Sequence, residues 1–302
     1  MTRILFVFVD GIGLGPAHAA NPLSTTPLPS FGQLAGGHAW TTEVPHVTTP
    51  SHVFRPIDAT LGIDGLPQSG TGQATLLTGV NCAALVGRHF GPFPHSATHE
   101  ALASDNLFAR IQRLDRRSAP AFANAYPPRF FDYARERRRW TVTTRCCLEA
   151  NVPVRSLDAL RDGRALTADL TGAGWTPLGH NVPVITEAEA GSRFVTLARD
   201  YPLTLFEYFL TDKAGHRRID QSPTSILQSL DHFFEAILER MDPRNELLLI
   251  TSDHGNIEDG DRTTHTRHPV PLIAYGQGAH HFADATSLID VTPRIVRALA
   301  GS

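Results

Sequence analysis

The sequence has little of what marks secreted, membrane-spanning or nucleic-acid-binding proteins. Its three cysteines, Cys82, Cys146 and Cys147, form no paired framework and no Cys-x-x-Cys motif, so we expect a reducing compartment. No hydrophobic run is long enough to span a bilayer. The apolar stretch 4–9 ends at Asp10, so we expect no secretory signal and a cytoplasmic location. The net charge of −3 favours neither nucleic acid nor a membrane as a partner.

The composition is that of an ordinary globular protein with unusually many histidines. A chain of 302 residues, 41% hydrophobic and 19% charged, can form one large α/β domain or one domain with an insertion. Fifteen histidines raise the expectation of a metal site. The sequence indicates no particular oligomeric state.

Strand and helix patterns alternate at the two ends of the chain. Near the N-terminus, the patterns predict strands over 3–9 and 52–60 and a helix over 73–78, after a glycine-rich loop at 65–72. The C-terminal third predicts strands over 203–210, 247–250 and 270–275 and helices over 224–241 and 291–300. This alternation predicts an α/β fold with a mostly parallel central sheet sandwiched by helices.

The middle of the chain lacks this alternation, and we expect a smaller inserted cap there. Glycines and prolines interrupt its periodicity, and the stretch 107–145 holds ten arginines against three acidic residues. The predicted division is a metal-binding catalytic core at 1–85 and 196–302, with a cap or substrate domain at 86–195. The arginines at 135–139 either form a solvated helical face or attract an anionic substrate, with Arg135 and Arg138 as candidate contacts.

Acidic, imidazole and hydroxyl side chains lie where the predicted strands end or a helix begins. They are Asp10, Ser69, Asp212, His216, Asp253, His254 and His265. Because open α/β sheets bind ligands at the carboxyl ends of their strands, we expect these side chains to lie together. Carboxylates and imidazoles without a thiolate suit two divalent ions such as Mn²⁺ or Zn²⁺.

Ser69 lies in the segment Gln-Ser-Gly-Thr-Gly-Gln (68–73), where the predicted loop meets the predicted helix. A helix N-terminus favours a phosphate through its dipole and backbone amides. A metal ion on the hydroxyl would make it a nucleophile, and two ions about 3.5–4 Å apart can hold the attacking and leaving oxygens in line. We therefore expect phosphoryl transfer from a small phosphorylated substrate through a phosphoserine. The same segment is also compatible with an ordinary helix N-cap.

The glycines after Asp10 are compatible with a second interpretation, a dinucleotide-binding turn. Gly11, Gly13 and Gly15 follow the first predicted strand closely. Pro16 and the Pro/Ser/Thr-rich run after it do not open a helix, however, so the sequence argues against this alternative.

Five segments, taken in order, form a pattern that is far more specific than any one of them. They are Phe-Val-Asp-Gly-Ile-Gly (8–13), Gly-Leu-Pro-Gln-Ser-Gly-Thr-Gly-Gln (65–73), Asp-Lys-Ala-Gly-His-Arg-Arg (212–218), Thr-Ser-Asp-His-Gly-Asn (251–256) and His-Thr-Arg-His-Pro-Val-Pro-Leu (265–272). The pattern resembles the metal-dependent branch of the alkaline phosphatase superfamily. Within that branch it is similar to the cofactor-independent phosphoglycerate mutases and the phosphopentomutases.

The resemblance implies an alkaline-phosphatase-like core with two metal sites, and Ser69 as the residue that is phosphorylated. One ion would be held by Asp10, Ser69, Asp253 and His254, and the second by Asp212, His216 and His265.

Two departures from the pattern leave the substrate and the fate of the phosphoryl group open. Gln73 stands where the mutases usually have His, and we take it as a candidate substrate contact. The predicted cap is also shorter than theirs and lacks their substrate signature. These departures favour a phosphatase, with a phosphomutase of the phosphoglycerate or phosphopentose type as the alternative. A phosphodiesterase or a non-catalytic metal-binding relative are further alternatives, whereas the sulfatase signature Cys/Ser-x-Pro-x-Arg is absent at Ser69.

Overall fold

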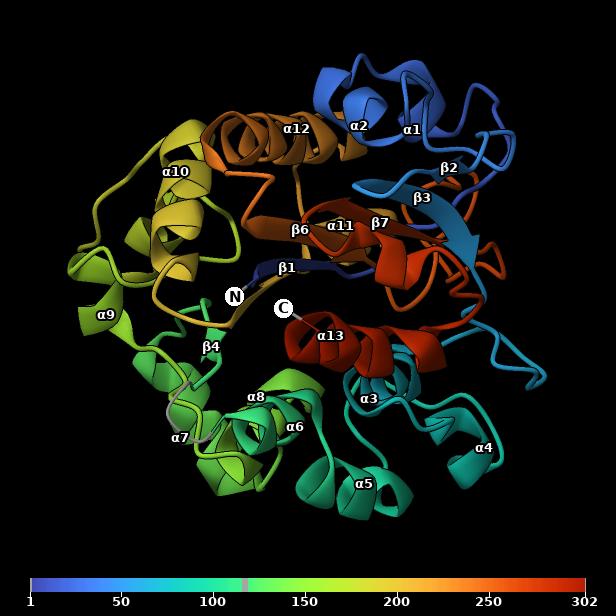
Figure 1. The fold of residues 1–302 in the computed structure, drawn as a ribbon. Helices are drawn as coiled ribbons and strands as arrows, with labels where there is room; N and C mark the ends of the chain where they lie inside the picture. The colour runs from blue at the N-terminus through green and yellow to red at the C-terminus, as the bar shows by residue number, and fades with distance from the viewer. Residues whose placement is uncertain (1, 116–118, 302) are drawn as a thin grey trace.

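A seven-stranded sheet runs through the centre of the computed structural model, which describes residues 2–115 and 119–301 (Figure 1). The strands of the described residues are β1 (Arg3–Val9), β2 (Val47–Thr48), β3 (His52–Ile57), β4 (Ala121–Phe122), β5 (Leu203–Tyr208), β6 (Glu246–Thr251) and β7 (Val270–Gly276). Their order across the sheet is β2-β3-β7-β6-β1-β5-β4.

The core of the sheet is parallel. Strand β1 pairs in parallel with β5 and with β6, and β5 pairs in parallel with β4. Strand β7 is antiparallel to both β6 and β3, and β2 is antiparallel to β3. Strands β1, β3, β4, β5 and β6 therefore point the same way, while β2 and β7 are reversed. The predicted mostly parallel sheet is confirmed, and its central strands are apolar because helices cover both faces.

The helices form two layers, one on each face of the sheet (Figure 1). One layer contains α1 (Pro22–Thr25), α2 (Pro29–Leu34), α10 (Glu187–Ala198) and α12 (Pro223–Arg240). The other contains α3 (Ser69–Thr78), α4 (Cys82–Val86), α5 (His99–Ser104), α6 (Leu107–Leu114), α8 (Val142–Glu149) and α13 (Val291–Ala300). The remaining helices are α7 (Pro128–Arg137), α9 (Leu157–Arg161) and α11 (Leu210–Gly215), with short 3-10 turns at Ser96–Thr98, Ala173–Leu178, Ala279–Phe282 and Leu288–Asp290. Side chains of β1 alternate between the two apolar clusters, with Phe6 in one and Val7 in the other.

Most predicted elements are present, with shifted ends. Strand β1 matches its predicted range, and the predicted helix 224–241 is α12, which begins at Pro223 behind the N-cap Ser222. The predicted strand 52–60 ends at Ile57. Helix α3 begins at Ser69 rather than at residue 73, because Gly70 and Gly72, which the sequence favours as loop, are held in the first helical turn by close packing.

The predicted cap, residues 86–195, contributes to the core as well as to the periphery. Its strand β4 pairs with the edge of β5, and its helices α5, α6 and α8 pack in the same apolar cluster as β1. A third, smaller cluster lies wholly within this segment and includes Ala125, Leu160 and Trp175. The boundaries at 86 and 195 stay predictions.

The structure shows the burial of the cysteines and the lengths of the helices. Cys82, Cys146 and Cys147 are buried and free of disulfides. Within the described ranges, no helix is both long enough and apolar enough to cross a bilayer.

Candidate metal centre

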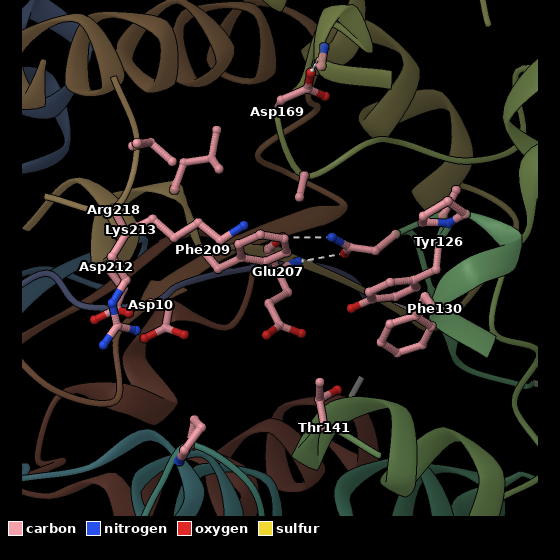
Figure 2. A pocket seen from close by; sticks show the side chains of 18 of the residues that line it. Asp10, Tyr126, Phe130, Thr141, Asp169, Glu207, Phe209, Asp212, Lys213 and Arg218 are labelled. Atoms are coloured by element: carbon pink, nitrogen blue, oxygen red, sulfur yellow. Dashed lines mark hydrogen bonds between the residues drawn. The ribbon is translucent and has the colours of Figure 1, made fainter. Parts of the chain in front are cut away.

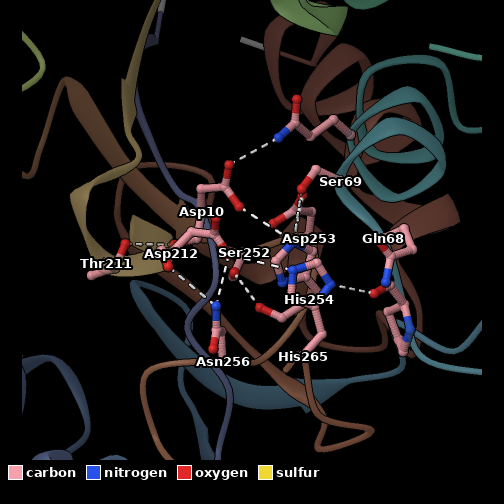
Figure 3. A network of polar contacts seen from close by, with 12 residues as sticks. Asp10, Gln68, Ser69, Thr211, Asp212, Ser252, Asp253, His254, Asn256 and His265 are labelled. Atoms are coloured by element: carbon pink, nitrogen blue, oxygen red, sulfur yellow. Dashed lines mark hydrogen bonds and ion pairs between the residues drawn. The ribbon is translucent and has the colours of Figure 1, made fainter. Parts of the chain in front are cut away.

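The seven side chains predicted to bind metal meet at one edge of the sheet, where β1, β5 and β6 end. Figure 3 shows six of them, all except His216. The acids come from three places, since Asp10 directly follows β1, Asp212 lies in α11 after β5, and Asp253 follows β6. Ser69 begins α3, and His265 lies in the loop before β7. The convergence follows from the parallel core, because parallel strands carry their carboxyl ends to the same edge.

One group of ligand-type atoms comprises Asp212, His216 and His265, whose atoms lie within 4.8 Å of one another. Nε2 of His216 and Nε2 of His265 are 2.9 Å apart, and they lie 3.3 and 3.5 Å from Oδ1 of Asp212. Nδ1 of His216 lies 2.6 Å from the carbonyl oxygen of Thr263, and Nδ1 of His265 lies 2.6 Å from that of Pro67. A carbonyl only accepts, so each Nδ1 is the donor, and each Nε2 keeps a lone pair for a metal ion.

A second group surrounds Nε2 of His254. Oγ of Ser69 lies 3.0 Å from this nitrogen, Oδ1 of Asp10 lies 3.4 Å from it, and Oδ2 of Asp253 lies 3.5 Å from it. The rings of His254 and His265 stack with their centroids 3.7 Å apart, so the two groups are neighbours. Asp212 is shared, because its carboxylate also lies within 4.8 Å of the ligand-type atoms of Asp10 and His254, and the division into two ligand sets stays a prediction.

Buried carboxylate oxygens without hydrogen bonds show that these residues fit a cation. Neither carboxylate oxygen of Asp253 accepts a hydrogen bond from the described residues, and the same holds for Oδ1 of Asp10. Asp253 is completely buried. A buried charge without a partner is unfavourable by several kcal/mol or more, and a bound metal ion removes this penalty.

The surroundings of the candidate ligands raise the pKa values of some and lower those of others. Burial, followed by the charge of Asp212, raises the pKa of Asp253 to about 7. Burial, together with Asp253, also raises the pKa of Asp10 well above its usual range. Burial lowers the pKa of His254 to about 3, which keeps this imidazole neutral and able to bind a metal ion. Burial acts to raise the pKa of Asp212, but the hydrogen bond with His265 and the neighbouring His254 outweigh it and lower that pKa below its usual range.

Two amide side chains orient the carboxylates. Gln73 donates from Nε2 to Oδ2 of Asp10 at 3.1 Å, and Asn256 donates from Nδ2 to Oδ1 of Asp212 at 2.8 Å. Gln73 was predicted as a substrate contact, and the structure places it against Asp10 as well as on the wall of the neighbouring pocket. The amide at position 73 therefore holds the Asp10 carboxylate in place.

The glycines on either side of Thr71 let the first turn of α3 approach its neighbours. A Cβ on Gly70 would overlap the backbone carbonyl of Phe93, and a Cβ on Gly72 would lie 2.9 Å from the backbone oxygen of Asp253. Side chains at these two positions would push Ser69 away from the metal centre, which explains the Ser-Gly-Thr-Gly sequence.

Glu258 is a supporting residue that the sequence analysis missed. Its buried carboxylate accepts hydrogen bonds from the backbone N–H groups of Gly13 at 2.9 Å and Asn256 at 2.7 Å. It also contacts the hydroxyl of Thr266 and lies 3.1 Å from Nδ1 of His268. Glu258 thus ties the loop after β1 to the loop after β6, and nothing in the local sequence distinguishes it from an ordinary loop acid.

A pocket of about 920 Å³ opens beside the metal centre (Figure 2). One side is formed by Asp10, Ser69, Gln73 and Asp212. The opposite side comes from the middle of the chain, within 92–141 and 168–178. Both ranges lie within the segment 86–195 that was predicted as a cap or substrate domain, although the individual side chains of this wall were not predicted.

The cations of the pocket are not the predicted ones. Arg129, Lys213 and Arg218 line it, whereas Arg135 and Arg138 do not. Arg135 is instead exposed and lies 3.3 Å from the exposed Asp132. Two further arginines of the same stretch, at positions 116 and 117, lie outside the described residues.

Comparison with known proteins shows which protein family and which enzymes the chain is similar to. Residues 187–301 match the family model described as the Metalloenzyme superfamily. A 2,3-bisphosphoglycerate-independent phosphoglycerate mutase of Legionella pneumophila (strain Paris) is 30% identical over 109 residues, which are 34% of this chain and 21% of the relative. The corresponding mutase of Vibrio parahaemolyticus is 30% identical over 128 residues, or 39% of this chain and 25% of that protein. The matches thus span about a fifth to a quarter of the length of these curated relatives.

Solved structures resemble the fold along the entire chain. The PH0037 protein from Pyrococcus horikoshii has a TM-score of 0.59 at 15% identity, covering 100% of this chain and 97% of that one. Alkaline phosphatase from the Antarctic bacterium TAB5 has a TM-score of 0.53 at 12% identity, covering 99% and 98%. Residues 187–301 are therefore similar to the Metalloenzyme superfamily, and the fold of the chain is alkaline-phosphatase-like. Its homology to the phosphoglycerate mutases is partial, and its relatives support a metal-dependent enzyme.

Proposed function

We propose that the chain is a two-metal phosphoryl-transfer enzyme that acts on a phosphate monoester through Ser69. The observation that carries the proposal is the position of Ser69, whose Oγ lies 3.0 Å from Nε2 of His254 among carboxylate oxygens that accept no hydrogen bond. A hydroxyl placed among metal ligands at the N-terminus of α3 has the position that a phosphorylated nucleophile requires.

The proposed ligands follow the two groups in space. Asp10, Ser69, Asp253 and His254 would hold one divalent ion, and Asp212, His216 and His265 would hold the other. Mn²⁺ and Zn²⁺ both suit this set of oxygen and imidazole donors. When bound, the two ions supply positive charge that favours the ionised serine and the phosphoryl oxygens.

The remaining steps are assigned to residues of the chain. Oγ of Ser69 loses its proton to water and forms a bond to phosphorus, the bond from phosphorus to the ester oxygen of the substrate breaks with its electron pair, and the departing alkoxide takes a proton from water. Gln73 and Asn256 keep the carboxylates of Asp10 and Asp212 in position during this exchange. Arg129, Lys213 and Arg218 place positive charge around the pocket and attract an anionic ester.

Hydrolysis of the phosphoserine by water is the reaction that we favour. A pocket of about 920 Å³ leaves room for water beside a small ester, and exclusion of water is what a mutase needs. The mutase alternative is supported by the partial homology to phosphoglycerate mutases, which covers 34% and 39% of the chain in two of these relatives. In that reaction a second oxygen of the substrate, rather than water, would take the phosphoryl group from Ser69.

A substrate screen in isotopically labelled water tests the proposal. The Mn²⁺-loaded protein is incubated with sugar phosphates, phospho-acids, simple alkyl phosphates and one phosphodiester. Labelled free phosphate indicates hydrolysis, and an isomer formed without label indicates a mutase, whereas turnover of the diester alone would make the chain a phosphodiesterase. If no compound is turned over and mass spectrometry finds no phosphate on Ser69, the proposal is wrong and a non-catalytic metal-binding protein is favoured.

A further inference from the structure

The pocket beside the metal centre is much larger than a phosphate group, and its far wall is apolar. Its volume of about 920 Å³ is in the range of pockets that hold drug-sized organic molecules. The far wall includes Tyr126 and Phe130, whose rings stack with centroids 4.0 Å apart and planes 25° apart. Phe93 and Trp175 extend this aromatic surface. A three-carbon phosphate ester held by the metal centre would leave the aromatic wall in contact with water.

Two exposed apolar side chains complete the wall. Tyr133 is 48% exposed and Leu178 is 41% exposed, and both line the pocket. Exposure of large apolar side chains is ordinary when they are scattered, but here they continue a buried aromatic surface into a cavity. This arrangement is typical of a site whose ligand has an apolar part.

Glu207 is a buried acid in this pocket that the proposed phosphoryl transfer does not use, and the same pocket is also lined by the polar residues Asn124, Arg129, Thr141 and Asp169. Glu207 belongs to β5, lines the pocket and is only 5% exposed. Its Oε2 accepts no hydrogen bond from the described residues. Burial raises the pKa of Glu207 to about 7, against a smaller opposing effect of the Thr143 side chain. A buried acceptor without a donor is unfavourable by about 1–3 kcal/mol, which a ligand donor would recover.

Asn124 holds Glu207 in place. The side-chain amide of Asn124 donates to the backbone oxygen of Glu207 at 2.7 Å, and its Oδ1 accepts from the backbone N–H of Glu207 at 2.8 Å. Both hydrogen bonds extend the pairing of β4 with β5 beyond the end of β4. Figure 2 shows the Glu207 carboxylate in the pocket, between Asp10 and the Tyr126–Phe130 pair.

We infer that this pocket selects phosphate esters whose organic part carries an apolar ring and a hydroxyl or amino donor, the ring lying on the Tyr126–Phe130 wall and the donor on Glu207. The inference rests on the proposed function, because the metal centre must hold the phosphate end. Burial of a ring contributes about 25 cal/mol per Å² of apolar surface. A hydroxyl or amino group of the ligand would donate to the Glu207 carboxylate that lines the pocket, whereas the ionised form of that carboxylate would repel the carboxylate of a phospho-acid.

Binding of non-hydrolysable analogues separates this inference from the catalytic proposal. Dissociation constants of ethylphosphonate, benzylphosphonate and 3-(hydroxymethyl)benzylphosphonate are measured by calorimetry with the Mn²⁺-loaded protein. We expect the ring to tighten binding about tenfold or more, and the added hydroxyl about tenfold again. Equal affinities overturn the inference and leave the proposed function intact, because that function is judged by turnover in the substrate screen. Absence of binding by all three phosphonates would overturn both.

Variants test which residues produce the two gains in affinity, one from the ring and one from the hydroxyl. Glu207→Leu should abolish the advantage of the hydroxyl and keep the advantage of the ring, and Glu207→Gln, which retains an acceptor oxygen, should restore part of it. Leu178→Ala should weaken the two ring compounds by about threefold and leave ethylphosphonate unchanged. Its matched control is Leu148→Ala, since Leu148 is 45% exposed but does not line the pocket.

Comparing the affinities of one variant for all three phosphonates distinguishes a lost specific contact from general damage to the fold. General damage to the fold would weaken all three phosphonates equally, and such a result would overturn the assignment of Glu207 as a specific contact. An undiminished hydroxyl advantage in Glu207→Leu would overturn it as well.

Discussion

Across the pocket, the polar side chains of the metal centre face an aromatic and aliphatic wall contributed by the middle of the chain (Figure 2). The metal centre lies at the ends of β1, β5 and β6, and hydrogen bonds from Gln73 and Asn256 orient its carboxylates. The far wall is built mainly of rings such as Tyr126 and Phe130, which contact through their faces. The oriented carboxylates of the first side suit the proposed metal ions and a phosphate group. The flat rings of the second side suit contact with the organic part of a substrate.

The buried acids of the metal centre and the buried acid Glu207 differ in the partner that would satisfy their carboxylate oxygens. Asp10 and Asp253 have carboxylate oxygens without hydrogen bonds among several potential metal ligands, so a cation satisfies them. Glu207 is equally buried but has no metal-ligating cluster around it among the described residues. The difference fits the two proposals, in which metal ions neutralise Asp10 and Asp253 and a hydrogen-bond donor of the ligand contacts Glu207.

Removal of the nucleophile should have the largest effect and should touch only the metal side. Ser69→Ala should lower turnover by about 10⁴-fold or more, because it removes the group that attacks phosphorus. Both ions should remain, since six other ligand side chains are intact. Steady-state kinetics and elemental analysis measure the two quantities. The matched control Thr71→Ser keeps a hydroxyl at the neighbouring position and should retain turnover; trapped phosphate on residue 71 would show that the nucleophile is misassigned.

Removal of one imidazole should affect only one of the two proposed metal sites. His265→Ala should release one ion and retain the other, because His265 belongs to the group with Asp212 and His216. Metal content per chain, measured after dialysis, should fall from two ions to one. His280→Ala removes a histidine far from the ligand groups and should keep both ions. Loss of both ions from His265→Ala would mean that the two sites are not separable.

Neutralisation of Glu207 should change the pH dependence of stability. Its folded pKa of about 7 lies above the ordinary 4.5, so between these values the native state keeps a proton that the unfolded chain releases. The free energy of unfolding of the parent therefore falls as pH rises from about 4.5 to 7, by up to about 3 kcal/mol. Glu207→Gln lacks this loss and should gain stability relative to the parent over the same range.

Urea unfolding of the metal-free proteins at several pH values measures the effect. The exposed Glu235→Gln serves as the control, because a carboxylate that stays in water in both states gives a far smaller pH-dependent difference. A constant difference between the parent and Glu207→Gln from pH 5 to 8 would contradict the burial of Glu207.

The smallest expected effect concerns the residue that positions Glu207. Asn124→Ala removes two hydrogen bonds to the backbone of Glu207 and leaves a buried N–H and carbonyl without partners. We expect a loss of about 1–3 kcal/mol in the free energy of unfolding, measured by urea denaturation. Asn181→Ala, at an exposed position, should change stability by less than about 0.5 kcal/mol. Equal stability of the two variants would show that Asn124 does not hold the strand edge.

Local patterns in the sequence predicted which acidic and imidazole side chains lie at the ends of the strands. The apolar run of β1 ends at Asp10, and the run of β6 ends at Asp253 and His254, so strand ends and ligands were visible together. Helix α10 was not predicted, although its capping box of Thr186 and Glu189 is present in the sequence. The substrate contacts were predicted at Arg135 and Arg138, whereas the structure places Arg129 in the pocket wall. The local density of arginines does not reveal which face of α7 is directed toward the cavity.

Composition, alternation and short motifs by themselves determined the class of fold and the chemistry of the ligands, because strand ends and their side chains are local features of the chain. Only the tertiary structure decided that Glu207, an ordinary strand residue in the sequence, faces a cavity beside Tyr126 and Phe130. Burial and the absence of a hydrogen-bond donor are properties of the surroundings of a side chain, and these surroundings come from segments more than 60 residues away in the sequence.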